Sequence, residues 1–90
     1  MADMIIEYKV MPEDGEVEYS KLEEVTKKTV ESFKDDVKII HVLEEAVGFG
    51  LKAVLIKFQQ DENNGSEELE NQLTDLPEVG EVSVTFMDRL

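Results

Sequence analysis

The sequence contains no cysteine and only one histidine, His41. Without cysteine the chain has no disulfide, no thiolate metal site and no cysteine nucleophile, and one histidine cannot build a multi-histidine site. No apolar run approaches the roughly 18 residues of a membrane-spanning helix. We therefore expect no metal, no cofactor and no membrane contact.

Basic residues are also scarce, since 9 lysines and arginines stand against 22 aspartates and glutamates. The resulting net charge of -13 repels phosphate backbones and anionic membranes at long range and favours a basic partner. We expect no direct contact with nucleic acid. The amino terminus lacks the basic and then apolar stretch of a secretory signal, which predicts a cytoplasmic protein.

Four segments show the period-two alternation of β-strands, at residues 4–11, 37–43, 51–58 and 79–87. The second and third segments are predicted to pair as a hairpin through a connector over residues 44–50. In the second, His41 is expected on the same face as Val37 and Ile39, where a histidine is usually structural, so it receives no catalytic role. The last segment alternates through Val82, Val84 and Phe86.

Two further segments have helical spacing. The first is predicted to begin at Ser20, which forms a capping box with Glu23, and to end near residues 34–36. Its apolar stripe is Leu22, Val25, Thr29 and Phe33. The second follows a turn at residues 61–66 and carries Leu69, Leu73 and Leu76.

The predicted order is β-α-β-β-α-β, which is the ferredoxin-like α+β plan. In this plan two helices cover one face of a four-stranded antiparallel sheet. Ninety residues support one core, so we expect a single domain over residues 1–90. Fold alone does not choose a function.

Neighbouring carboxylates are numerous, but none is marked as a separate acid or base, and we expect them to be solvated. Two features stand out instead. Phe49 lies between Gly48 and Gly50, where glycines permit unusual backbone angles and close approach of another surface. Its side chain either projects or folds back over the core. Arg89, the only arginine, stands one residue from the carboxyl terminus.

With this element order, the chain resembles archaeal translation elongation factor 1-beta over its whole length. The segments that carry the resemblance are 6–12 (Ile-Glu-Tyr-Lys-Val-Met-Pro), 46–53 (Ala-Val-Gly-Phe-Gly-Leu-Lys-Ala) and 79–84 (Val-Gly-Glu-Val-Ser-Val), which leads into 87–90 (Met-Asp-Arg-Leu). The family matches the catalytic carboxyl-terminal domain of the eukaryotic subunit and promotes exchange of GDP for GTP on elongation factor 1-alpha. The resemblance therefore implies a non-enzymatic exchange factor that is a monomer when free.

The resemblance also implies which residues meet the GTPase. In the family's complexes the aromatic residue between two glycines enters the GTPase, and a cation beside the carboxyl terminus enters its magnesium site. The matching positions are Gly48, Phe49, Gly50, Arg89 and Leu90. The eukaryotic pattern has lysine as the terminal cation, so Arg89 is a departure, since a planar guanidinium differs from an ammonium in shape and hydration.

Three alternatives rank below the exchange factor. A regulatory ferredoxin-like domain would form a dimer that holds a small metabolite. An acylphosphatase-like enzyme would need an arginine in an early phosphate-binding loop, where residues 12–16 are Pro-Glu-Asp-Gly-Glu. An RNA-recognition domain would need exposed aromatic and basic residues on its central strands, and residues 51–58 offer two lysines and one aromatic.

Overall fold

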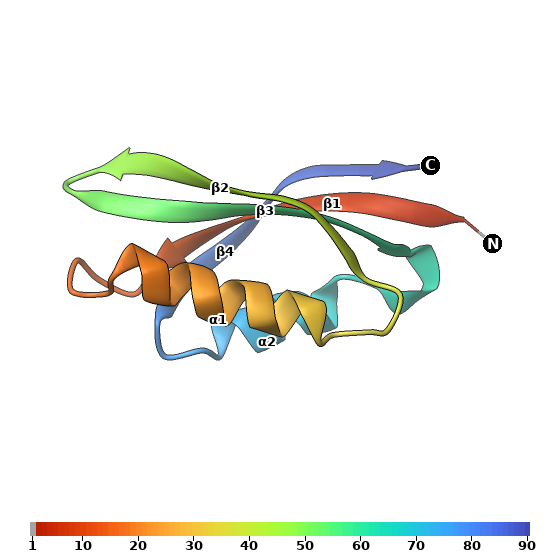
Figure 1. Ribbon diagram of the computed structural model, residues 1–90, viewed down its shortest axis with the longest axis horizontal. Helices are drawn as coiled ribbons and strands as arrows, with labels where there is room; N and C mark the ends of the chain where they lie inside the picture. The colour runs from red at the N-terminus through yellow and green to blue at the C-terminus, as the bar shows by residue number, and fades with distance from the viewer. Residues whose placement is uncertain (1) are drawn as a thin grey trace.

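The computed structural model describes residues 2–90 as one antiparallel sheet with two α-helices (Figure 1). The elements are β1 (Asp3–Pro12), α1 (Tyr19–Glu31), β2 (Lys38–Gly48), β3 (Leu51–Asp61), the short 3-10 helix η1 (Glu62–Asn64), α2 (Glu67–Thr74) and β4 (Val79–Arg89). The strand order is β2-β3-β1-β4, and both helices lie on the same face of the sheet. This arrangement confirms the ferredoxin-like prediction.

The core lies between the sheet and the helices. In β1 the alternate residues Ile6, Tyr8 and Val10 are fully buried, because successive side chains of a strand point to opposite faces. The remaining core residues are Leu22, Val30, Phe33, Val54, Ile56, Phe58, Leu69, Leu73 and Val79. The Tyr8 hydroxyl donates a hydrogen bond to the Ser66 carbonyl at 3.1 Å, and burial raises the pKa of Tyr8, so this donor stays protonated.

Helix α1 begins at Tyr19, one residue before the predicted start, and its N-cap residue is Glu18. Ser20 is therefore inside the helix, and no side-chain capping bond forms at this end. The predicted capping box with Glu23 is wrong. Tyr19 packs against the core, and this tertiary contact fixes the start of the helix ahead of the local capping signal.

The buried stripe of α1 also differs from the prediction. Leu22, Thr26 and Val30 are fully buried, at the i, i+4 spacing of one helix face. The predicted Val25 and Thr29 are half-buried beside this stripe. The sequence pattern did not place Thr26 in the stripe because threonine carries a polar hydroxyl, although its methyl group can pack against the sheet.

A β-bulge in β2 changes which residues share a face. The pairing with β3 shifts between Ile39 and His41, so the intervening residue breaks the alternation. Ile39 packs against the core, whereas His41 lies on the open face and contacts Glu7. The predicted common face for these two residues is wrong.

A second bulge interrupts β4. The pairing with β1 shifts between Glu7 and Tyr8, which pair with Phe86 and Val84 respectively. Val82 packs against the core, but Phe86 lies on the open face with Glu7. The uninterrupted alternation predicted for β4 is therefore wrong.

The second helix confirms its prediction, since Leu69 and Leu73 are fully buried and Leu76 packs against the core just after the helix ends. The turn before it is held by Asp36 from the α1–β2 loop. Its carboxylate accepts hydrogen bonds from the Asn64 side chain at 2.9 Å and from the Asp61 amide at 2.7 Å. These bonds, the Asn64 bond first, lower the pKa of Asp36.

Candidate protein-binding site at the two ends of the sheet

Strands β2 and β3 form a long hairpin whose loop has only two residues. The last pair of the ladder joins Gly48 to Leu51, so Phe49 and Gly50 make the turn. The predicted connector over residues 44–50 is wrong, because β2 continues as far as Gly48. Both loop residues have positive φ, 53° and 76°, as in the type I′ turns that match the twist of a hairpin.

The backbone of Phe49 is in a region that bulky residues avoid. The left-handed conformation disfavours a residue with a Cβ by roughly 1–2 kcal/mol, whereas glycine adopts it freely. The positive φ is therefore unstrained at Gly48, where it is 94°, and at Gly50, but it is strained at Phe49. A conformation this unfavourable is retained where the surrounding turn enforces it, and such positions gather at functional sites.

The Phe49 side chain is fully exposed, with a relative accessibility of 102%. Of the two interpretations of the sequence, the structure therefore shows projection and not a lid on the core. At this exposure the ring of Phe49 makes no packing contact that would stabilise the fold. The ring is free to enter a pocket of another macromolecule.

The carboxyl-terminal residues are paired, not frayed. Arg89 pairs with Met4 across β1 and β4, and the Leu90 amide donates to the Asp3 carbonyl at 3.0 Å. The Arg89 side chain is 78% exposed, and its Nε lies 3.1 Å from Glu62 Oε2. This charge contact joins residues far apart in the chain, so the local sequence gave no signal for it.

The structure does not bring Phe49 and Arg89 together. The hairpin loop lies at the Leu51 end of β3. Near the other end of β3, Gln60 pairs with Met4, and Met4 pairs with Arg89 on its other side, so Arg89 and Gln60 lie at the same level of the sheet. Nine steps along a strand correspond to about 30 Å. Figure 1 shows the β2–β3 loop and the carboxyl terminus at opposite ends of the molecule, whose longest extent is 42 Å. A partner that meets both must be of similar length.

Between these ends, the open face of the sheet carries a polar network around Glu7. Its carboxylate lies 3.0 Å from His41 Nε2 and accepts a hydrogen bond from the Thr85 hydroxyl at 2.9 Å. Burial raises the pKa of Glu7, but the bonds from His41 and Thr85 and the charge of Lys57 outweigh it, and the net effect is a lowered pKa. The Lys57 ammonium also lies over the Phe86 ring, 4.6 Å from its centroid. The network links all four strands.

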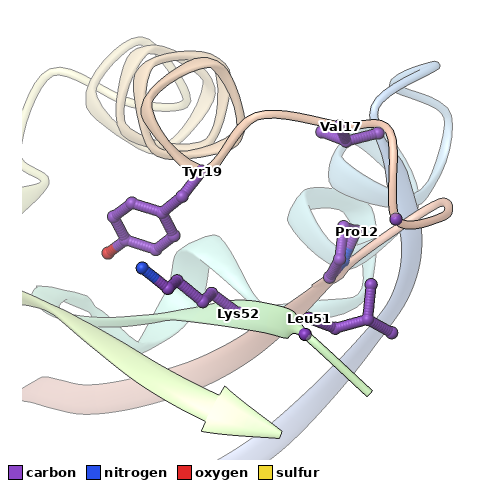
Figure 2. A pocket seen from close by; sticks show the side chains of 7 residues that line it. Pro12, Val17, Tyr19, Leu51 and Lys52 are labelled. Atoms are coloured by element: carbon purple, nitrogen blue, oxygen red, sulfur yellow. The ribbon is translucent and has the colours of Figure 1, made fainter. Parts of the chain in front are cut away.

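A pocket of about 210 Å³ lies beside the base of the hairpin, on the helix side (Figure 2). Its lining residues are Pro12, Gly15, Val17, Tyr19, Gly50, Leu51 and Lys52. The Tyr19 hydroxyl itself is buried, next to the Glu23 side chain. Burial raises the pKa of Tyr19 to about 12, and the charge of Glu23, a hydrogen bond with the Glu23 side chain and the charge of Glu44 contribute in that order.

Within the described part of the chain, no group of three or more histidine, aspartate or glutamate side chains is placed to hold a metal ion. None of the helices in residues 2–90 has the length and apolar character of a membrane span.

These features define a ferredoxin-like domain with an exposed aromatic residue at one end of its sheet and an exposed arginine near the other. A de novo designed protein, Foldit4, has the same fold, with a TM-score of 0.65 over 96% of each chain at 17% identity. Residues 5–90 match the family described as the EF-1 guanine nucleotide exchange domain. The chain belongs to this family, so it is a guanine nucleotide exchange factor of the elongation factor 1 type.

Archaeal relatives named Elongation factor 1-beta match nearly the full chain. The relative from Caldivirga maquilingensis is 35% identical over 100% of this chain and 98% of its own length. The relative from Methanocaldococcus jannaschii is 36% identical over 91% of this chain and 91% of its own length. The relative from Methanosphaera stadtmanae is also 36% identical, over 100% of this chain and 99% of its own length. The resemblance inferred from residues 6–12, 46–53, 79–84 and 87–90 is confirmed.

Proposed function

We propose that this protein, as one domain over residues 1–90, promotes exchange of GDP for GTP on elongation factor 1-alpha in the cytoplasm. The observation that carries the proposal is Phe49, fully exposed on a two-residue loop in a chain of this family. The protein makes and breaks no bonds in this role. It changes the affinity of its partner for nucleotide by binding it.

Phe49 is the anchor at one end of the proposed contact. An aromatic side chain that enters a pocket removes its whole surface from water, and such anchors dominate the energy of many interfaces. Because the loop has two residues between paired strands, the ring loses little backbone freedom on binding. Gly48 and Gly50 contribute by permitting the turn and by leaving the flanks of the ring free of side chains.

Arg89 is the cation at the other end. A magnesium ion in a GTPase bridges the nucleotide phosphates to the protein and is the largest positive charge of that site. A guanidinium that takes the place of the ion supplies charge but not the ion's octahedral coordination, so the phosphates are held less tightly. Leu90, which is 66% exposed beside Arg89, extends this contact.

Thermodynamic linkage makes the effect mutual. If the factor lowers the affinity of the GTPase for GDP, then bound GDP lowers the affinity for the factor by the same ratio. This coupling lets the factor leave once a new nucleotide is bound. The net charge of -13 supports fast association with a basic surface of the GTPase.

Release of a fluorescent GDP analogue from elongation factor 1-alpha tests the proposal. We expect the wild-type protein to accelerate release, and we expect rising magnesium to suppress that acceleration because the ion competes with Arg89. Arg89→Ala should remove this magnesium dependence. A folded wild-type protein that leaves the release rate unchanged would contradict the proposal.

A further inference from the structure

The Phe49 loop lies at the end of a two-stranded part of the sheet. The pairing of β1 with β3 ends at Val10 and Val54, but β2 and β3 continue to pair up to the loop. We call residues 45–53 the hairpin arm, because within residues 2–90 its two strands pair only with each other. Leu51 is three residues beyond Val54, so the arm extends about 10 Å past the last β1–β3 pair.

A two-stranded arm needs support from outside its own pairing. An isolated two-stranded hairpin is marginally stable in water, and it twists more than a wider sheet does. The arm also contains a register shift between Ala46 and Gly48, and such a bulge bends a strand. Because the exposed Phe49 ring has no packing contact, it follows the backbone of the arm. The direction of the ring therefore depends on what holds the arm.

On the helix side, the arm rests on the loop between β1 and α1, residues 13–18. Residues 48–50 are exposed, whereas Leu51 is half-buried and lines the pocket together with Gly15 and Val17. A Cβ built on Gly15 would lie 3.8 Å from Leu51 Cδ2, which is an ordinary van der Waals distance. Figure 2 shows the Leu51 side chain extending from β3 toward this loop.

The β1–α1 loop is itself tied to the rest of the domain. At its start, the Glu13 amide donates a hydrogen bond to the Glu78 carbonyl at 2.9 Å. Inside it, the Glu16 amide donates to the Asp14 carboxylate at 2.9 Å and closes a local turn. Near its end, Val17 packs against the hydrophobic core. The loop is therefore held at three places and can support the arm.

The other contact of the arm lies farther from its tip. On the open face, the Lys9 ammonium lies 3.3 Å from Glu45 Oε1, at the base of the arm. Both side chains are partly exposed, and ion pairs of this kind contribute little to stability. Leu51, by contrast, pairs with Gly48 in the last pair before the loop. The apolar contact of Leu51 thus acts directly beside Phe49.

We propose that Leu51 is a positioning residue for nucleotide exchange. By resting on the β1–α1 loop it fixes the direction of the hairpin arm and holds Phe49 where the GTPase receives it. This inference depends on the proposed function. A ring that is held in place before binding loses less conformational freedom when it binds, so its affinity is higher. Without the contact, the arm has to become ordered during binding, while the Arg89 end is unaffected.

Truncation of Leu51 tests this role. We expect Leu51→Ala to raise the concentration for half-maximal GDP release about fivefold, with the maximal rate unchanged. Leu51→Met keeps the side-chain volume and should behave as wild type. Ile39→Ala is the matched control, because it removes the same number of carbon atoms near the other end of β2, where Ile39 packs against the core. It should lower the Tm but leave half-saturation per folded molecule unchanged.

A double-mutant cycle separates positioning from a direct contact. In a Phe49→Ala background, Leu51→Ala should change GDP release at subsaturating factor by less than about twofold, because the ring that Leu51 positions is absent. Equal effects of Leu51→Ala in the two backgrounds would show that it acts independently of Phe49, and the proposal would be wrong.

Backbone ¹⁵N relaxation of the free protein gives a readout that does not involve the GTPase. In Leu51→Ala, the order parameters of Gly48 and Gly50 should fall from the roughly 0.85 of a rigid backbone toward the roughly 0.6 of a flexible one. They should not fall in Ile39→Ala. Unchanged order parameters in Leu51→Ala would refute the positioning role even if wild type accelerates GDP release. A wild-type protein that leaves release unchanged would refute the proposed function, and the positioning role with it.

Discussion

At the hairpin end of the sheet Phe49 has no neighbour to hold it, whereas at the other end Arg89 belongs to a paired strand and contacts Glu62. The position of Phe49 is set by the backbone, through positive φ at both residues of a two-residue loop. The position of Arg89 is set by its pairing and by a nearby charge. The comparison shows an aromatic side chain placed by the backbone alone at one end, and a cation placed by strand pairing and by a charge contact at the other.

The sheet between the two ends fixes their separation. Its open face carries the network around Glu7, which reaches from His41 in β2 to Thr85 in β4. Its other face packs on the helices and forms the core. About 30 Å of paired strand therefore separates the anchor from the cation.

Phe49→Ala should have the largest effect on exchange. Loss of an interface anchor is typically worth 2 kcal/mol or more, so we expect GDP release at subsaturating factor to fall about 30-fold or further. Because the ring is fully exposed, the free energy of unfolding should change by less than about 0.5 kcal/mol. Phe49→Tyr is the control and should keep most activity. A large loss of stability in Phe49→Ala would show that the ring packs on the protein itself.

Arg89→Ala should reduce exchange by about tenfold, in line with loss of one charge-assisted contact. Arg89→Lys keeps the charge and should retain more activity than Arg89→Ala. Urea unfolding should detect little change, because exposed ion pairs contribute roughly 0–1 kcal/mol. Equal activity of Arg89→Ala and wild type would remove the carboxyl-terminal end from the contact.

Gly50→Ala tests whether the backbone sets the hairpin tip. Alanine at φ of 76° should destabilise the protein by roughly 1–2 kcal/mol, although an added Cβ there meets no atom within 4 Å. We expect a drop in Tm of roughly 4–8 °C for each kcal/mol in a domain of this size. Gly15→Ala, where φ is not positive, should leave Tm nearly unchanged. Equal Tm values for the two variants would contradict the assigned turn.

Glu7→Gln tests the network between the ends through its pH dependence. The folded-state pKa of Glu7 is lowered from the ordinary value of 4.5, so its carboxylate stabilises the folded protein above that pH. This contribution is lost as the pH falls through the lower, folded-state value. The difference in unfolding free energy between wild type and Glu7→Gln should therefore shrink from pH 7 to pH 3. A difference that stays constant over this range would contradict the network.

Glu62→Gln should have the smallest effect. It removes the charge that Arg89 contacts, but the arginine side chain is 78% exposed and remains attached to a paired strand. We expect GDP release to change by less than about threefold. A tenfold loss would instead show that Glu62 positions Arg89 and that the carboxyl-terminal end is as fixed as the hairpin.

Local patterns predicted the order of elements and most strand ranges, because alternation and turn residues are local signals. The bulges in β2 and β4 could not be read in this way, since a bulge depends on the pairing with a neighbouring strand. For this reason the predicted common faces, of His41 with Ile39 and of Phe86 with Val82, are wrong. The predicted start of α1 is wrong for a similar reason, because the packing of Tyr19 against the core outweighs the capping signal of Ser20.

The sequence alone identified Phe49 and Arg89 as candidate site residues. It did not indicate that the two lie at opposite ends of the sheet. Gly48 and Gly50 indicated a special backbone, whereas exposure of the ring follows from the two-residue loop, which depends on how far β2 and β3 pair. The pocket lined by Tyr19 and Lys52 combines distant segments and left no pattern in the sequence.

A mixing experiment tests the central claim that both ends of one molecule act on one GTPase. Phe49→Ala and Arg89→Ala proteins are assayed for GDP release separately and as an equimolar mixture at the same total concentration. Since the ends lie about 30 Å apart on a single sheet, we predict that the mixture will be no faster than the average of the two variants. Recovery of wild-type release in the mixture would contradict the account, because it would mean that the two ends act from different molecules.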